Sequence, residues 1–249
     1  MYEHIGLDLL WKFDPLALSA LGRDRAYYHL FKRMLDVSVA MLALVILSPI
    51  MAVIAVAIIL DSGWPVIFAQ KRVGAQRWTR VGYCYWQRTT FTFYKFRSMV
   101  QDADPAMHMA FVKAFMSNDH ESMAALQGEN TQTYKLVRDP RVTRLGRLLR
   151  RCSLDELPQL WNVLKGDMSL VGPRPPIAYE VDEYKSWHHR RLGAKPGLTG
   201  LWQVVGRSSV DFDEMVRLDI QYAENQSFWL DLKILLKTPL AVLSGKGAA

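Results

Sequence analysis

Cysteine is scarce in this chain of 249 residues, which has only Cys84 and Cys152 and no CxxC spacing. Two cysteines without that spacing indicate neither a disulfide framework nor a zinc ribbon. The six histidines are scattered except for one adjacent pair, so they show no metal-ligand spacing either. The scarcity of cysteine fits a reducing, cytosolic environment.

Acidic residues are missing between Asp61 and Asp102, and over the whole chain 31 lysines and arginines exceed 24 aspartates and glutamates. The net charge of +7 indicates an anionic partner, which leaves nucleic acid, phosphorylated ligands and membrane surfaces open. Internal repeats and low-complexity segments are missing too, which argues against a repeat architecture. Half of the residues are apolar, enough for the core of one domain with appendages.

Charged residues are also missing from Val37 to Leu60, a run of 24 residues. This length matches a helix that crosses a membrane, whereas a secretory signal peptide would start earlier and be shorter. Ser48 and Pro49 stand at the midpoint, where proline removes a helix hydrogen bond and predicts a kink. The hydroxyl of Ser48 can satisfy the freed carbonyl.

Both flanks of this run are basic, with Lys32 and Arg33 before it and five basic residues after it, up to Arg88. The positive-inside rule places basic flanks in the cytoplasm. Both flanks satisfy it together only if the helix enters the membrane, bends at the kink and returns to the same face. We therefore predict a re-entrant membrane helical hairpin over 34–62.

The rest of the sequence predicts a mixed α/β fold that is mostly helical, with little sheet. The N-terminal extension, 1–33, holds a short amphipathic piece expected at the membrane surface. A small globular domain on the cytoplasmic side is predicted over 63–249. Near its end, 229–243 is too short and too charged to span a membrane, and we expect an interfacial amphipathic helix there.

A strand is expected at 64–69 (WPVIFA), and alternating aromatic residues predict another at 90–97 (TFTFYKFR). The segment 74–90 between them is expected to be a hairpin or loop. It is long and aromatic, which predicts contact with membrane or substrate.

A basic segment follows, with seven basic residues and one acid between Lys135 and Arg151. Arg141, Arg144, Arg147 and Arg151 recur at helical spacing, opposite an apolar side. Such a face is either solvated or meets phosphates and anionic headgroups, and the apolar run upstream favours the second interpretation.

Two adjacent carboxylates, Asp155 and Glu156, stand in the apolar stretch SLDELPQLWN, soon after Arg150. A purely structural interpretation is a capping box, with Ser153 as N-cap of a helix that ends at Gly166. A chemical interpretation is that the pair holds Mg²⁺ and that one carboxylate accepts a phosphoryl group. Neighbouring arginines would then keep Asp155 ionised.

Two loops rich in glycine follow, GDMSLVGPRPP at 166–176 around Arg174 and KPGLTGLWQVVGR at 195–207, which ends at Arg207. Glycine-rich turns can present backbone N–H groups to anions, although each loop also fits an ordinary surface turn. Together with the arginines and the carboxylate pair they indicate phosphoryl-group chemistry.

The order of these pieces resembles the bacterial sugar transferases, the monotopic phosphoglycosyl transferases. The matching segments span nearly all of 31–240 and read FKRMLDV, the apolar run with its central SP, FAQKRVG, FYKFRSM, TRLGRLLRRCSLDELPQLWNVLKGDMSLVGPRP, KPGLTGLWQVVGR and YAENQSFWLDLKIL. The resemblance implies a catalytic core with a short N-terminal extension.

The resemblance also implies an activity: transfer of a sugar-1-phosphate, here expected to be a hexose-1-phosphate, from a UDP-sugar to undecaprenyl phosphate with release of UMP. It implies Mg²⁺ as cofactor and a place in the bacterial inner membrane, with the catalytic domain on the cytoplasmic face. The reaction would be the first membrane step of exopolysaccharide or other glycoconjugate synthesis. Membrane lipid and a second copy of the chain, as a homodimer, are further candidate partners, and no nucleic acid is expected.

Site residues carry over one by one by this resemblance. Asp155 corresponds to the nucleophile that forms the covalent phosphosugar intermediate, and Glu156 is its partner beside the metal. Further positions correspond to phosphate- and substrate-binding residues: Lys95, Arg97, Arg150, Arg174, Arg207 and Asp219. Locking of a loop would also explain Arg97, and a surface ion pair would also explain Arg207 and Asp219.

A different class of function is a membrane-tethered basic adaptor without catalytic activity, which binds nucleic acid or anionic lipid. Charge alone permits it. It leaves the Asp155-Glu156 pair and the rigid loop around Arg174 unexplained.

Overall fold

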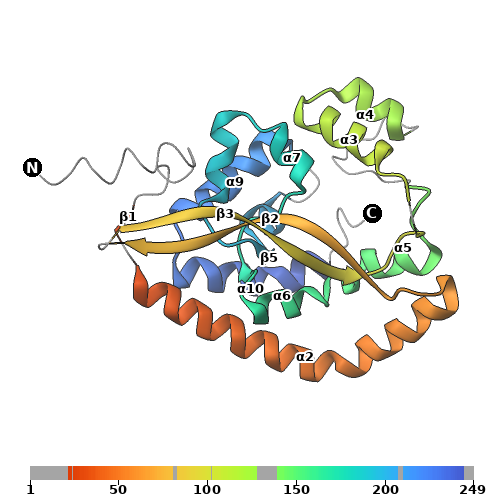
Figure 1. The fold of residues 1–249 in the computed structure, drawn as a ribbon, viewed down its shortest axis with the longest axis horizontal. Coiled ribbons are helices and arrows are strands. Elements are labelled where there is room, and N and C mark those ends of the chain that lie inside the picture. The colour runs from red at the N-terminus through yellow and green to blue at the C-terminus, as the bar shows by residue number, and fades with distance from the viewer. Residues whose placement is uncertain are drawn as a thin grey trace, which may run out of the picture.

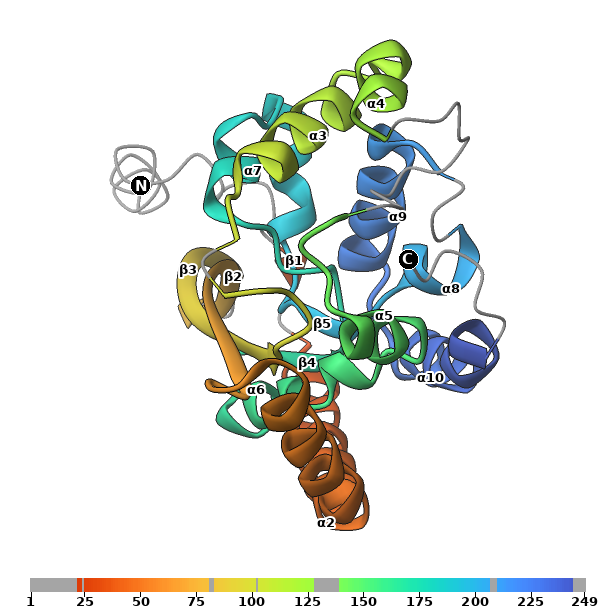
Figure 2. The ribbon, with the colours of Figure 1, turned by 90° about the vertical axis from the view of Figure 1, so that its right-hand side faces the viewer.

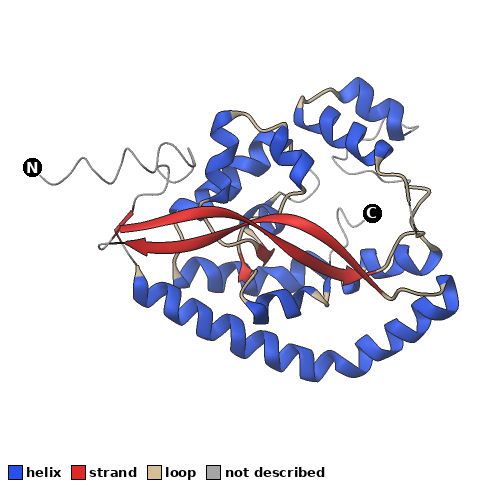
Figure 3. Ribbon diagram, in the orientation of Figure 1, coloured by secondary structure: helices blue, strands red, loops and turns tan. Residues whose placement is uncertain are grey.

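The computed structural model describes residues 22–23, 25–80, 83–101, 103–127, 139–206 and 210–243. The predicted amphipathic piece near the N-terminus lies outside them. Helices dominate the described part, as predicted, and strands form one long hairpin with a short third strand and one short pair (Figure 3). The elements are, in order, β1 (Gly22–Arg23), α2 (Ala26–Ser62), β2 (Ile67–Arg80), β3 (Tyr83–Phe96), α3 (Ala106–Met116), α4 (His120–Gln127), α5 (Arg144–Arg151), η2 (Leu154–Glu156), α6 (Gln159–Lys165), β4 (Ser169–Val171), α7 (Ala178–Asp182), η3 (Ser186–Leu192), β5 (Gly197–Thr199), α8 (Leu201–Val205), α9 (Phe212–Glu224) and α10 (Phe228–Leu243).

The apolar run forms most of α2, which begins earlier than the predicted boundary and continues without interruption through Pro49. As predicted, the Ser48 hydroxyl donates a hydrogen bond, 2.8 Å long, to the carbonyl of Val45. That carbonyl lies four residues before Pro49, which has no N–H to offer it. The expected break is therefore a bend within one continuous helix (Figure 1). A re-entrant hairpin is not confirmed and stays a prediction.

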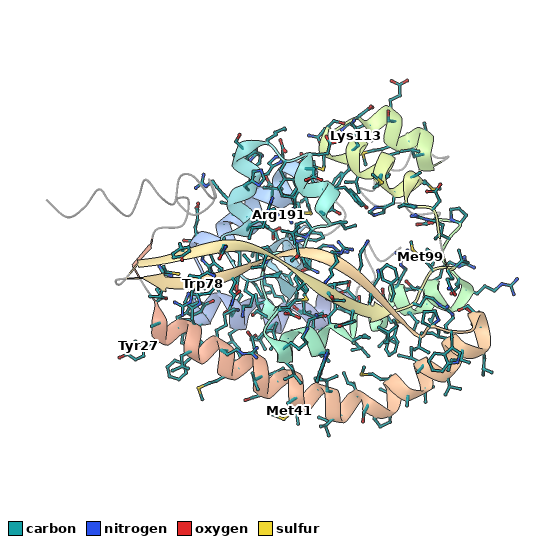
Figure 4. All side chains as sticks on the ribbon, in the orientation of Figure 1. Tyr27, Met41, Trp78, Met99, Lys113 and Arg191 are labelled. Carbon is teal, nitrogen blue, oxygen red and sulfur yellow. The ribbon has the colours of Figure 1, made fainter. Side chains whose placement is uncertain are left out.

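The outer side of α2 is apolar and exposed. Tyr27 and Met41 project from it away from the body of the molecule (Figure 4), and 82% and 53% of their surfaces are exposed. Figure 2 shows α2 along one edge of the molecule. In the described part of the chain it is the one helix long and apolar enough to cross a membrane, by length and composition.

The hairpin of β2 and β3 is much longer than the two predicted strands. Its antiparallel register runs from Ile67 opposite Phe96 to Arg80 opposite Tyr83, and β1 adds a short third strand along β3. The segment 74–90 is therefore mostly paired strand rather than loop. Of the two expectations, hairpin or loop, the hairpin is confirmed. The strand pattern is hard to read from the sequence because Gln87, Arg88 and Thr90 are all exposed, which interrupts the alternation of buried and exposed residues.

The two glycine-rich loops pair with each other as the parallel strands β4 and β5. The N–H of Gly172 donates to Thr199 O (2.9 Å), and the N–H of Gly197 donates to Pro173 O (2.8 Å). A Cβ on Gly197 would stand 2.0 Å from the nitrogen of Gly172, so close strand packing requires glycine. These N–H groups are therefore not available for the anion binding considered from the sequence.

Two apolar clusters connect α2 to the rest of the molecule. The larger one joins α2, β3, α6, β4, α9 and α10 around Ala40, Phe93 and Val163. The second packs the C-terminal half of α2, at Ile54 and Ile58, against β3 and α5. The apolar helix α2 thus contributes to two hydrophobic clusters of the globular part.

Candidate functional site

The carboxylate pair lies in a single tight turn between α5 and α6. Asp155 and Glu156 belong to the 3-10 turn η2, and α6 begins only at Gln159. Ser153 has a left-handed backbone (φ 56°) and makes no capping hydrogen bond, so the predicted capping box is wrong. The helix ends at Gly166 as predicted. The purely structural explanation for Glu156 therefore falls away.

Two side chains fix the position of α6 behind this turn. The Asn162 side chain accepts from Tyr94 N (3.1 Å) and donates to Thr92 O (2.6 Å), which attaches α6 to β3. Arg33 of α2 donates to the carbonyls of Val163 and Leu164, both at 2.6 Å. Cations at a helix C-terminus satisfy its free carbonyls and its negative end. Membrane helix and hairpin together therefore position the carboxylate pair.

Three predicted cations surround Asp155, whose surface is 5% exposed. Burial, and next the negative charge of Glu156, raise the pKa of Asp155, whereas Lys95, Arg150 and Arg174 act to lower it. The net direction is upward. Burial therefore outweighs the effect of the neighbouring cations on this pKa. That the carboxylate is ionised stays a prediction.

The cations come from three elements. Lys95 lies on β3, and burial lowers its pKa to about 8, against the attraction of Asp155. Arg150 lies in the last turn of α5, and burial lowers its pKa as well. Arg174 lies in the loop after β4, with its Nη1 3.8 Å from Oε1 of Glu156. Cationic groups, which are suited to bind phosphate, therefore converge on the pair from a strand, a helix and a loop.

Two other predicted residues are not part of this group, and a third is not described by the structure. Arg97 donates to Ser62 Oγ (2.8 Å) and Gly63 O (2.5 Å), so it locks the C-terminal end of α2. Asp219 is fully buried in an ion pair with Arg191, neither exposed nor a surface pair. Arg207 lies outside the described residues.

Sequence reasoning missed two residues beside the pair, Arg72 and Gln159. Both line a small cavity together with Glu156 and Arg174. Arg72 belongs to the segment FAQKRVG and Gln159 to DELPQ, so the resemblance covered both without assigning them a role. Their burial beside the pair is the signal for both residues, and only the structure supplies it.

The donor set at the pair suits Mg²⁺. Asp155 and Glu156 offer two adjacent carboxylates, and Mg²⁺ in proteins commonly takes one or two carboxylates and completes its shell with water and substrate phosphate. In the described residues no cluster of three or more His, Cys, Asp or Glu side chains forms a complete metal cage.

The surfaces predicted to meet the membrane are partly as expected. Arg144, Arg147 and Arg151 are exposed on α5, whereas Arg141 precedes the helix and pairs with Asp139 at 2.7 Å. On α10 a row of large apolar side chains is exposed, with Trp229 75%, Leu236 69% and Leu240 70% exposed. Contact of these surfaces with lipid stays a prediction.

Comparison with known proteins gives a consistent family. A family model described as bacterial sugar transferase matches residues 27–245. The chain is 46% identical over 99% of its length to galactosyl transferase CpsE of Streptococcus agalactiae and covers 50% of that protein. It is 43% identical over 87% of its length to undecaprenyl-phosphate galactose phosphotransferase of Salmonella typhimurium and covers 41% of it. With exopolysaccharide production protein ExoY of Sinorhizobium fredii the identity is 37%, over 91% of this chain and 92% of ExoY. The chain thus spans about half the length of CpsE, less than half of the Salmonella protein and nearly all of ExoY.

Proposed function

Because the chain belongs to the bacterial sugar transferase family, we propose that it transfers a sugar-1-phosphate from a UDP-sugar to undecaprenyl phosphate. The names of similar proteins support both substrates, undecaprenyl phosphate in one and a UDP-sugar in another. Three of the names specify galactose or a galactosyl group, so a hexose-1-phosphate is the proposed cargo. The name of ExoY supports a role in exopolysaccharide synthesis. The observation that carries the proposal is a buried carboxylate, Asp155, placed beside Glu156 among three cations.

In the proposed first step, an Asp155 carboxylate oxygen attacks the phosphorus attached to the sugar. The bond from that phosphorus to the bridging oxygen breaks, and UMP leaves with the bridging oxygen and its electron pair. The phosphosugar stays on Asp155 as an acyl phosphate. In the second step a phosphate oxygen of undecaprenyl phosphate attacks the same phosphorus, and the carboxylate leaves. The product is undecaprenyl diphosphosugar.

The cations have two tasks in this scheme. Lys95, Arg150 and Arg174 favour the ionised form of Asp155, which is the nucleophile, against the effect of burial. They also offset the charge of the diphosphate as the bond to UMP breaks. Mg²⁺ held by Asp155 and Glu156 would supply further charge stabilisation to the phosphate oxygens.

The proposed reaction takes place at the cytoplasmic face of the bacterial inner membrane, with α2 re-entrant. Two contacts support this course. Near its start, Lys32 of α2 pairs with Asp231 at 2.9 Å, and at its end Ser62 accepts from Arg97. Both ends of the helix are therefore attached to the same globular part, although a membrane-spanning helix would place them on opposite faces.

The decisive experiment measures UMP release by the purified protein with undecaprenyl phosphate, Mg²⁺ and a panel of UDP-sugars. Asp155→Asn should lower the rate by more than about 1,000-fold, because the nucleophile is lost. Asp182→Asn, the same change at an exposed carboxylate of α7, is the matched control and should keep the wild-type rate. Equal rates for wild type and Asp155→Asn would remove Asp155 as nucleophile. No release from any donor would favour the adaptor interpretation.

A further inference from the structure

Arg72 is a buried cation without a matching anion. Its surface is 7% exposed, and in the described part of the chain it forms no ion pair with a carboxylate. Its Nη1 donates to Pro175 O at 3.2 Å, its guanidinium lies 5.2 Å from the centre of the Phe93 ring, and its Nε has no partner. A buried guanidinium is costly unless an anion and acceptors compensate it.

Other buried cations of this protein have stronger partners than Arg72. Arg191 has Asp219, and Lys32 has Asp231. Arg97 also has no carboxylate partner among the described residues, and its Nε and Nη1 are unpartnered there, but it donates to two acceptors at the negative C-terminal end of α2, away from the carboxylate pair. Arg72 donates to one carbonyl and lies over an aromatic ring, and it forms no ion pair with a described carboxylate. Burial lowers its pKa to about 10, although Glu180 and Glu156 attract its charge without pairing with it.

The unused donor of Arg72 lies next to the reaction centre. The register sets Arg72 opposite Phe91 and Phe68 opposite Lys95, so Arg72 and Lys95 project from the same face of the hairpin. Arg72 lines a cavity of about 10 Å³ with Glu156, Arg174 and Gln159. Gln159, 2% exposed, also has an unpartnered buried donor, its Nε2.

The size and charge of this cavity limit what it can accept. A cavity of roughly 10–15 Å³ holds one water-sized group, such as a single oxygen atom. Two arginines against one carboxylate favour an oxygen that carries negative charge. Two N–H donors require that it accept hydrogen bonds.

We propose that Arg72 and Gln159 form a subsite that binds one phosphoryl oxygen of a substrate beside the carboxylate pair. The subsite rests on the proposed function, in which two substrates carry such an oxygen. One is the UDP-sugar, in its diphosphate, and the other is the lipid, in its phosphate. Arg72 thereby gains the anion that the protein itself does not provide.

The test is steady-state kinetics of UMP release for Arg72→Gln, with both substrates varied in turn. Loss of a hydrogen bond to a charged group should raise one KM by roughly 10- to 100-fold. A raised KM for the UDP-sugar assigns the subsite to the donor, and a raised KM for undecaprenyl phosphate assigns it to the acceptor. Lys71→Gln removes the same charge from the exposed neighbour of Arg72 and should leave both constants within about 2-fold of wild type. Unchanged constants in Arg72→Gln would overturn the proposal.

Gln159 provides a second variant in case Arg72→Gln is poorly folded. Gln159→Leu removes the donor, and Gln159→Glu replaces it with a charge that repels a phosphoryl oxygen. The same KM should rise in both, and more in Gln159→Glu. If Gln159→Glu binds as well as wild type, the occupant is not an anionic oxygen and the proposal fails.

A binding measurement separates this proposal from the proposed function. Pyrophosphate should raise the Tm of the wild-type protein, and the rise should be absent in Arg72→Gln but present in Lys71→Gln. A wild type that responds to pyrophosphate in this way but releases no UMP from any UDP-sugar would contradict the proposed function and support the subsite. Equal Tm shifts in wild type and Arg72→Gln would overturn the subsite whatever the activity.

Discussion

Burial acts against ionisation at Asp155, and the side chains around it compensate only in part. The pKa of this carboxyl is raised although Lys95, Arg150 and Arg174 all lower it. A dry site strengthens every later interaction with the substrate, because charges attract more strongly at low dielectric. The same burial that makes Asp155 harder to ionise therefore strengthens the attraction between the surrounding cations and any phosphate that binds beside it.

His108 provides a pH-dependent test of this cationic region. Its Nδ1 lies 2.6 Å from Tyr179 Oη, and burial, then the charges of Arg141, Arg72 and Arg174, lower its pKa to about 4. An unfolded histidine titrates near 6.5, so between about 6.5 and 4 the unfolded state binds more protons than the folded state. The free energy of unfolding should therefore fall, by about 1–2 kcal/mol after allowance for partial exposure, as pH falls through this window.

Denaturant unfolding in detergent at pH 7 and pH 5 checks this. His108→Gln should reduce the loss of stability between the two values, whereas His120→Gln, in the neighbouring helix α4, should not. The same loss in wild type and His108→Gln would show that another group is responsible.

At the scale of elements, α6 follows closely on the turn η2 that carries the carboxylate pair, and side-chain hydrogen bonds from two sides fix its position. The Asn162 side chain forms the hydrogen bonds that a neighbouring strand would otherwise form with β3, because it accepts from Tyr94 N and donates to Thr92 O. On the other side Arg33 connects α6 to α2. The distance from Asp155 to Lys95 therefore depends on how α6 rests against the hairpin.

Replacement of Asn162 by alanine should be costly. It leaves a buried N–H and a buried carbonyl of β3 without partners, which should lower the free energy of unfolding by about 2–4 kcal/mol. Lys165→Ala on the same helix breaks only an exposed pair with Asp167 and should cost less than about 1 kcal/mol. Denaturant unfolding compares the two, and a similar cost for both would contradict the positioning role of Asn162.

At the scale of the whole molecule, α2 acts as both anchor and part of the core. Its outer side is apolar and exposed, while Ala40 and Ile58 are buried against the globular part. Close to its start, Lys32 and Tyr28 both donate to Asp231 of α10, so the last described helix is attached to the membrane helix. The position of the site relative to the membrane is thus set by the fold and not by a flexible linker.

The re-entrant course predicts the same side for both ends of α2. Single cysteines at Tyr27 and Asp61, with Cys84 and Cys152 replaced by serine, should react with a membrane-impermeant maleimide only after the inner membrane is permeabilised. In intact spheroplasts, labelling of one position but not the other would show a helix that spans the membrane. UMP release by the cysteine variants confirms that they remain folded.

Local patterns in the sequence determined the features that depend only on residues close together in the chain. The absence of charge from Val37 to Leu60, the bond from Ser48 to the carbonyl that Pro49 leaves free, and the helix end at Gly166 follow from chain geometry alone. The carboxylate pair can be recognised from the sequence, because two adjacent carboxylates in an apolar stretch are unusual in any fold.

Tertiary structure decided whatever depends on contacts between distant segments. The full length of the hairpin, the pairing of the two glycine-rich loops and the burial of Asp219 against Arg191 all arise between residues far apart in sequence. So does the role of Arg72. In the sequence it is one basic residue among many, and only the fold shows that its charge is buried beside the site without an anion, because burial is a property of the packed chain and not of the residue.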